Sequence, residues 1–158
     1  MIVSFDLDDT LFVDANKAKT EKDLSFPYKY IYKEKLRYGT VDLLKKMQNH
    51  NIKIWIYTTS YRTIKYIKSY FKHYGIVIDD VINGERHSRE VQGDRLEPLP
   101  SKYPSKYRIN LHVDDEISVY QNGKIYGYKV FLLKNDDLDW TFSLWEEIKK
   151  IMSRPNLS

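Results

Sequence analysis

The sequence contains no cysteine and no long hydrophobic run. The lack of cysteine excludes disulfide bonds, thiolate metal sites and cysteine nucleophiles, and it favours a reducing compartment. No apolar run approaches the roughly 18 residues that a membrane-spanning helix needs. The opening residues, MIVSFDLDDT, carry acids where a signal peptide would be apolar, and no basic segment precedes them. We therefore expect a cytoplasmic protein with no membrane insertion from this segment.

The charge balance favours anionic partners. The 158 residues include 26 Lys and Arg against 22 Asp and Glu, which gives a net charge of +4. A positive charge attracts phosphorylated substrates or nucleic acid. The basic residues are scattered, however, and the Tyr- and Lys-rich stretch 28–38 is more typical of an amphipathic element whose rings pack inward than of a nucleic-acid surface. No oligomeric state is predicted.

Repeats and low-complexity segments are also absent, and hydrophobic periodicity divides the chain into strands and helices. Thr40, Ser60 and Asp139 can each cap the start of a helix, and Gly75 can end the helix that begins at Ser60. Short apolar runs predict strands over residues 1–5, 52–57, 76–82, 109–113 and 128–133, the third of them interrupted by Asp79 and Asp80. Apolar residues at helical spacing predict helices over residues 40–51, 60–75 and 140–152.

Strands that alternate with helices predict an α/β fold, namely a three-layer α/β/α, Rossmann-like parallel sheet of about five strands. The chain is long enough for one domain with a real core. We expect this domain to cover residues 1–152, followed by a tail or the start of a linker at 153–158. Residues 13–38 are predicted to form a connection or small flap, and residues 83–108 an irregular stretch.

Two predicted strands run directly into acidic residues. The first leads into Asp6 and Asp8, and the fourth leads into Asp114 and Asp115. In open parallel sheets, ligands bind beyond the carboxyl ends of the strands. A cluster of like charges there is unfavourable unless a cation or a reaction requires it. Asp6, Asp8 and Asp114 together form a hard oxygen site that suits Mg²⁺, which in turn attracts phosphate.

The segment DLDDT resembles the D-x-D-x-T signature of the haloacid dehalogenase (HAD) superfamily of phosphohydrolases, and the resemblance extends over roughly residues 1–135. It implies that Asp6 becomes an aspartyl-phosphate and that Asp8 protonates the leaving group and then activates water. It also implies Mg²⁺ as the cofactor, held by Asp6, Asp8 and Asp114. Asp115 is expected to support the metal through water.

Two further catalytic residues follow from the same resemblance. The segment IYTTS supplies a hydroxyl after a strand, for which Thr58 is preferred over the adjacent Thr59 and Ser60. A lysine should neutralise the nucleophile and the phosphoryl oxygens. Lys102 stands in a favourable context before Tyr-Pro, whereas Lys106 lies closer to the strand, so Lys102 is preferred and Lys106 stays an alternative. His87 is left out of the catalytic set, because Asp8 already serves as acid and base.

Members of this family differ mainly in a cap subdomain over the site. Residues 13–38 and 83–101 are short, and 83–101 shows no helical block, so little or no cap is expected. An open site admits large substrates. The sequence thus predicts a Mg²⁺-dependent phosphatase acting on a macromolecule, a phosphoprotein and first of all phosphotyrosine. The alternatives are a small-metabolite or nucleotide phosphatase, a nucleic-acid 3′-phosphatase, and a non-catalytic binding module.

Overall fold

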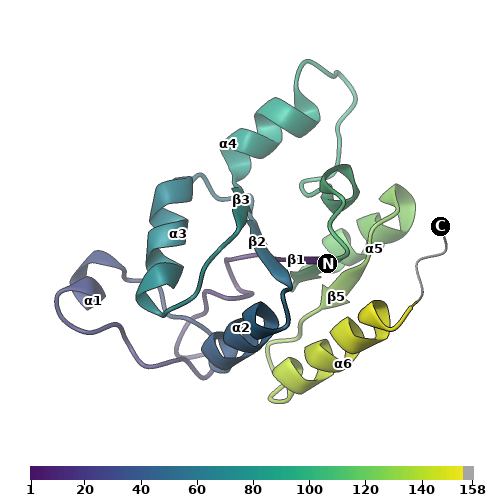
Figure 1. Ribbon diagram of the computed structural model, residues 1–158. Coiled ribbons are helices and arrows are strands. Elements are labelled where there is room, and N and C mark those ends of the chain that lie inside the picture. The colour runs from purple at the N-terminus through teal and green to yellow at the C-terminus, as the bar shows by residue number, and fades with distance from the viewer. Residues whose placement is uncertain (155–158) are drawn as a thin grey trace.

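The computed structural model describes residues 1–154, and its centre is a five-stranded sheet in which every paired strand is parallel (Figure 1). The strand order is β3-β2-β1-β4-β5, which places the first strand of the chain in the middle. The predicted α/β fold is therefore confirmed. The strands are β1 (Ile2–Phe5), β2 (Lys53–Tyr57), β3 (Asp80–Ile82), β4 (Leu111–Asp114) and β5 (Val130–Leu132).

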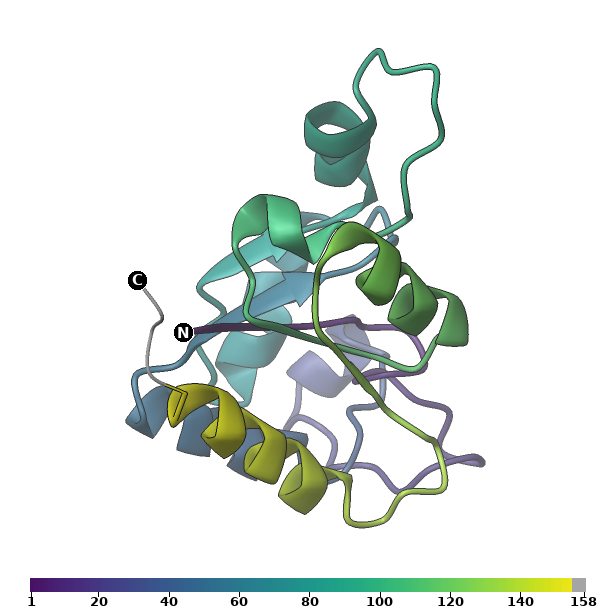
Figure 2. The ribbon, with the colours of Figure 1, turned by 90° about the vertical axis from the view of Figure 1, so that its right-hand side faces the viewer.

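Helices cover the sheet on both sides, with α2 and α6 side by side on one face and α5 on the other (Figure 2). None of the helices within residues 1–154 is long and apolar enough to cross a membrane. The helices are α1 (Tyr28–Ile31), α2 (Thr40–Asn49), α3 (Ile64–His73), α4 (Gly84–His87), α5 (Ile117–Tyr126) and α6 (Trp140–Met152). Two short irregular helical turns, η1 (Ser88–Gln92) and η2 (Pro104–Tyr107), complete the set.

The main hydrophobic core lies on one face of the sheet. Alternation along the strands points Val3, Phe5 and their counterparts in β2 and β4 to this face. The helices α2, α3 and α6 cover it with apolar residues at helical spacing, such as Leu44 and Met47 of α2. All of these side chains are buried, so most of the hydrophobic stabilisation of the fold comes from this layer.

The opposite face is built differently. The apolar cluster there is small and centres on Tyr57 and Ile82. Beside it, the alternation in β1 and β4 turns Ser4 and His112 to this face, and both are fully buried. Buried polar groups require hydrogen-bond partners, so this side of the sheet contains a polar network rather than a second large hydrophobic core.

Several predicted boundaries were wrong, each for a local reason. The strand predicted at 76–82 is reduced to β3, because the Asp79 carboxylate accepts the Ile54 N–H at 2.8 Å in place of a backbone partner. The helix predicted from residue 60 begins at Ile64, with Thr63 as its cap. Thr40 is the first helical residue of α2 rather than its cap. The cap position belongs to Gly39, whose φ of 87° suits glycine.

The prediction of an irregular segment without a helical block after residue 83 was wrong. The helix α4 and the turn η1 run on from one another and project beyond the sheet (Figure 1). The Asn83 side chain caps α4 by accepting from Arg86 N at 3.0 Å. Arg86 then bridges Asp80 and Glu90. This block is still far smaller than a domain, so the expectation of a minimal cap remains.

The predictions for Asp139, Gly75 and the C-terminal tail hold in part. Asp139 precedes α6 at the cap position, although its side chain makes no capping hydrogen bond. Gly75 follows α3 with a φ of 75°, as a helix-ending glycine should. Of the tail predicted at 153–158, residues 155–158 lie outside the described part of the chain.

Candidate active site

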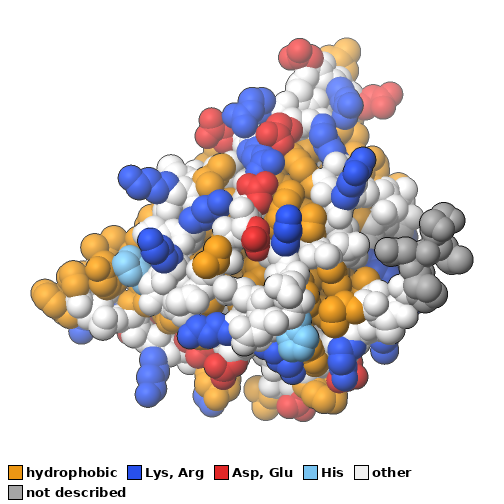
Figure 3. Space-filling model, in the orientation of Figure 1, with side chains coloured by type: hydrophobic (Ala, Val, Ile, Leu, Met, Phe, Trp, Pro, Cys, Tyr) orange, Lys and Arg blue, Asp and Glu red, His pale blue; other side chains and the backbone are white. Residues whose placement is uncertain are grey.

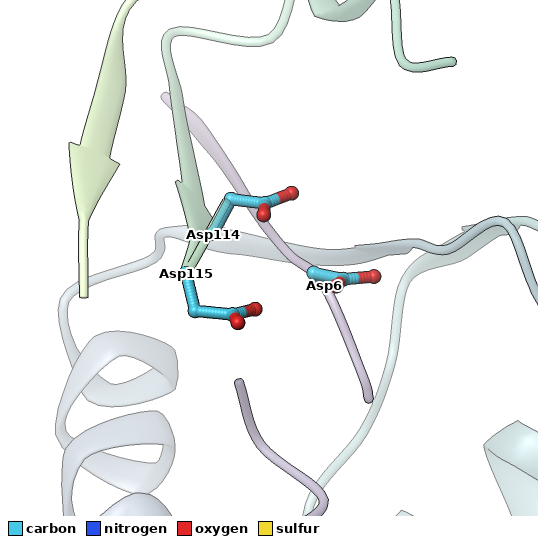
Figure 4. A group of neighbouring side chains, drawn as sticks. All are labelled: Asp6, Asp114 and Asp115. Carbon is cyan, nitrogen blue, oxygen red and sulfur yellow. The ribbon is translucent and has the colours of Figure 1, made fainter. Parts of the chain in front are cut away.

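Three carboxylates meet at the carboxyl ends of the two central strands. Asp6 follows β1, Asp114 ends β4, and Asp115 comes next. Because β1 and β4 are paired, with Phe5 opposite Val113, these side chains arrive at one point. One carboxylate oxygen from each lies within 4.8 Å of the others, and all three side chains point into the same space (Figure 4).

Lys102 inserts its ammonium group between two of these carboxylates. Its Nζ lies 2.9 Å from Oδ1 of Asp6 and 2.5 Å from Oδ2 of Asp114. Its side chain is only 2% exposed, so the interaction takes place out of contact with bulk water. A buried ammonium is stable only with such partners, and the two carboxylates keep the pKa of Lys102 raised despite its burial.

The pKa values of Asp6 and Asp114 are shifted in opposite directions. Burial raises the pKa of Asp6 to about 7, and Lys102 offsets part of this while the Asp114 charge adds to it. Burial would also raise the pKa of Asp114, but hydrogen bonding to His112 and the charge of Lys102 outweigh it and lower that pKa to about 2. Burial thus makes Asp6 hold its proton more firmly than Asp114 does.

This donor set fits a hard divalent cation. Carboxylate oxygens are the ligands that Mg²⁺ prefers, and it commonly binds to only one or two of them together with water. The pKa of Asp6 is raised first by its burial and further by the Asp114 charge, and a bound cation would favour its ionised form. The residues that would hold the ion are Asp6, Asp114 and Asp115.

Asp8 lies outside this cluster and lines a surface pocket with Arg62 and Glu34, which we call the mouth or entrance of the site. Its Oδ2 accepts from Nη1 of Arg62 at 2.9 Å, and its side chain is 51% exposed. Arg62 is held in turn by Glu34 and by the Ser60 hydroxyl. The Asp8 carboxylate, predicted as both acid–base group and metal ligand, therefore faces the entrance rather than the three-carboxylate cluster.

Hydrogen bonds from Arg37 fix the backbone of the turn that carries Asp8. Arg37 is buried, and its guanidinium donates to the carbonyl oxygens of Thr10 at 2.6 Å and Asp9 at 2.8 Å. The Thr10 hydroxyl donates to Asp115 at 2.8 Å, which links this turn to the end of β4. The last residue of the D-x-D-x-T segment thus joins the two acidic strand ends.

The other predicted residues occupy distinct places. Thr58 is buried just after β2, the neighbour of β1, and its hydroxyl accepts from Ser60 N. Lys106 lies elsewhere, since its Nζ donates to the Glu90 carbonyl oxygen. His87 ends α4, and its Nδ1 lies 2.6 Å from the Tyr57 hydroxyl.

Sequence reasoning missed the residues that support the cluster from below. His112 lies two positions before Asp114 and Ser4 two positions before Asp6, so strand alternation places each on the same face as its acid. That alternation was a readable signal. Arg62 and Arg37 carry no comparable signal, because the contacts that define them are long-range.

The fold resembles the solved structures of a hydrolase and of two HAD proteins. A hydrolase from Streptococcus pneumoniae superposes with a TM-score of 0.56 at 15% identity, covering 94% of this chain and 97% of that one. The HAD domain of the effector protein Lem4 from Legionella pneumophila, solved as an inactive mutant, gives 0.54 at 17% identity over 96% and 94%. A HAD-superfamily hydrolase from Ehrlichia chaffeensis gives 0.55 at 16% identity over 96% and 97%.

Neither protein-family models nor curated proteins match the sequence. At the identities seen among solved structures, similarity establishes the fold and leaves the activity to be argued from the site. The chain has the HAD-like α/β fold that the DLDDT segment led us to expect.

Proposed function

We propose that the protein is a Mg²⁺-dependent phosphomonoester phosphatase that works through an aspartyl-phosphate on Asp6. The observation that carries this proposal is the meeting of Asp6, Asp114 and Asp115, the first two of which hold Lys102. Asp8, two residues after Asp6, is exposed. Bound Mg²⁺ would offset negative charge on the carboxylates and the phosphoryl oxygens. Lys102 supplies further positive charge at the same place.

The reaction has two chemical steps. In the first, an oxygen of Asp6 attacks phosphorus, the bond from phosphorus to the ester oxygen breaks, and Asp8 gives that oxygen a proton. In the second, Asp8 takes a proton from water, and the resulting hydroxide attacks the phosphorus of the aspartyl-phosphate. Inorganic phosphate leaves and the Asp6 carboxylate is restored. Thr58, which directly follows the strand beside β1, is proposed to hydrogen-bond a phosphoryl oxygen.

The orientation of Asp8 supports its part in this scheme. An acid–base residue must reach the leaving group and the attacking water, both of which lie on the solvent side of the phosphorus. The half-exposed carboxylate of Asp8 faces that side, whereas Asp6 is buried. Two carboxylates in such different surroundings are suited to two different roles.

We infer a macromolecular substrate from the openness of this entrance. The α4–η1 block is small, and Asp8 is half-exposed at the mouth. Nearby, Tyr61 is 72% exposed and lines a pocket of about 190 Å³ with Gly84 and His87. A free tyrosine ring can stack on an aryl leaving group, which makes a phosphoprotein, and phosphotyrosine first, the preferred substrate.

The charge on one face of the molecule gives less support to a nucleic-acid substrate. Lys and Arg side chains are interspersed with acidic ones on the face shown in Figure 3, whereas binding to a phosphate backbone favours a continuous basic groove. If the protein is a phosphatase, the alternative substrates are a small metabolite, a nucleotide and an oligonucleotide 3′-phosphate. The rival from another class is a binding module that keeps the fold without turnover.

The deciding experiment measures hydrolysis of p-nitrophenyl phosphate by wild type and Asp6→Asn, with Mg²⁺ and with EDTA. Turnover that requires both Asp6 and Mg²⁺ is the expected result. A wild-type protein without turnover on any phosphate ester, but with measurable phosphopeptide binding, would favour the binding module. Phosphopeptides, nucleotides and 3′-phosphorylated oligonucleotides, compared at equal concentration, then rank the substrate classes.

A further inference from the structure

A buried chain of polar groups runs beneath the carboxylate cluster. The Ser4 hydroxyl and Nδ1 of His112 are 2.8 Å apart, and Nε2 of His112 is 2.9 Å from Oδ2 of Asp114. The same Oδ2 accepts from Lys102, which also contacts Asp6. Ser4, His112 and Asp114 are fully buried, so water does not compete for these contacts.

The direction of each hydrogen bond follows from the chemistry of the groups. An ionised carboxylate only accepts hydrogen bonds, so Nε2 of His112 must carry the proton that points to Asp114. The His112 ring is fully buried and shares Asp114 with the Lys102 ammonium, so a second positive charge there is disfavoured and Nδ1 is left as an acceptor. The Ser4 hydroxyl therefore donates to Nδ1. Ser4 thereby selects the tautomer that supports Asp114.

The two oxygens of Asp114 are then unequal. Oδ2 accepts from both His112 and Lys102, which fills its two lone-pair positions. Oδ1 accepts from Glu116 N at 2.9 Å and keeps one lone pair. A cation at the cluster finds a free lone pair only on Oδ1.

We propose that His112 is a positioning residue that reserves Oδ2 of Asp114 for Lys102 and thereby presents Oδ1 to the divalent cation. Without the imidazole, the carboxylate can rotate and its second oxygen can leave Lys102. Partners of this kind around metal-binding carboxylates typically affect affinity by about 10–100-fold. The inference rests on the proposed function in one respect, namely that Mg²⁺ binds at this cluster.

Calorimetric titration with MgCl₂ alone tests the proposal without turnover. His112→Leu, which fills the site but donates no hydrogen bond, should weaken Mg²⁺ binding by about 10–100-fold. His112→Gln, whose amide nitrogen can replace Nε2, should recover most of the wild-type affinity. The control is His50→Leu. His50 is exposed, and among residues 1–154 the only hydrogen-bond partner of its side chain is the Lys46 carbonyl oxygen. A folded His112→Leu with wild-type affinity would overturn the proposal.

A second measurement remains decisive if His112→Leu does not fold. Nitrogen-15 NMR of metal-free wild type should show the His112 proton on Nε2 and an acceptor Nδ1, and a proton on Nδ1 alone would overturn the proposal. Ser4→Ala, a smaller change, should weaken Mg²⁺ binding several-fold, and no loss would count against the role of the tautomer. A wild type that binds Mg²⁺ but hydrolyses nothing would contradict the phosphatase alone. A wild type that binds no Mg²⁺ would overturn both.

Discussion

Arg62 and Asp8 form an ion pair at the mouth of the site, with Nη1 of Arg62 2.9 Å from Oδ2 of Asp8. The paired Asp8 carboxylate is not part of the cluster of Asp6, Asp114 and Asp115. The carboxylates of the site are thereby divided into one group that faces the entrance and one that can hold a cation. The first two predictions follow from this division.

Asp8→Asn should slow both chemical steps while leaving Mg²⁺ binding nearly unchanged. Loss of the proton donor and base costs about 10²–10⁴-fold in each step. Rapid-quench measurement of the first step should show a smaller loss with p-nitrophenyl phosphate than with an alkyl phosphate, because the aryl oxygen needs less protonation. Equal losses on both substrates would remove Asp8 from the acid role, and a large loss of Mg²⁺ affinity by calorimetry would return its carboxylate to the metal site.

Asp6→Asn should abolish turnover and stabilise the metal-free protein at high pH. The folded-state pKa of Asp6, about 7, exceeds its ordinary value of 3.8, so the folded protein binds more protons between these values. The free energy of unfolding therefore falls as the pH rises from about 4 to about 7. Asn has no charge to bury, so calorimetry in EDTA should show its advantage in Tm growing between pH 5 and pH 8. A constant difference would contradict the raised pKa.

Chelation should remove the activity and Mg²⁺ should restore it. Asp114→Asn should raise the Mg²⁺ concentration needed, because one anionic ligand of the cluster becomes neutral. Ca²⁺ should inhibit, since its higher coordination number lets it engage both oxygens of Asp6 and block their attack. Steady-state rates at stepped concentrations of each ion provide the measurement, and full activity after exhaustive dialysis against EDTA would exclude the metal requirement.

Gly84→Ala should lower both stability and activity. A Cβ at this position would lie 2.5 Å from the Thr59 carbonyl oxygen and 3.0 Å from the Tyr61 ring, so the segment after Thr58 would have to move. Such overpacking costs about 1–3 kcal/mol in the free energy of unfolding. The matched control is Gly127→Ala, which meets no atom within 4 Å and suffers only from its positive φ. Urea unfolding of both variants separates close contact from backbone strain, and equal activity in the two would contradict the prediction.

Access to the site should favour long substrates. A site that is open to solvent at Asp8 can gain binding energy from the flanking chain, so kcat/KM on a phosphopeptide should equal or exceed that on the free phospho-amino acid. The net charge of +4 should add an attraction that weakens with salt. Hydrolysis confined to small phosphates, with peptides and oligonucleotides neither cleaved nor competing, would instead favour the metabolite phosphatase.

Hydrophobic alternation was enough to predict the central strands and the strand ends that carry Asp6 and Asp114. It could not reveal α4, because that helix has no apolar face to produce a periodic signal. Its residues are Gly84, Glu85, Arg86 and His87, and it is stabilised by the Asn83 cap and the ion pairs of Arg86. Polar contacts of this kind leave no regular spacing in the sequence.

The choice between two lysines shows a second limit of prediction from the sequence. Lys102 and Lys106 both precede β4, and their separation of one helical turn does not distinguish them. The distinction arises from η2, which begins between the two residues and directs Lys106 to the Glu90 carbonyl oxygen. His112 is the opposite case, since its register with Asp114 was readable, and a histidine within an apolar strand was the available clue.

The central place of β1 has a consequence for how the molecule assembles. β1 pairs with β2 on one side, but its other partner is β4, and the Ser4–His112 contact joins residues 108 positions apart. Contacts this distant in the chain form late and slow the folding of a domain. Until β4 docks, β1 presents an apolar edge with unpaired N–H and C=O groups, a state prone to aggregation. Asp6 thus belongs to one of the earliest segments of the chain, yet it acquires its surroundings only after most of the remaining sequence has found its place.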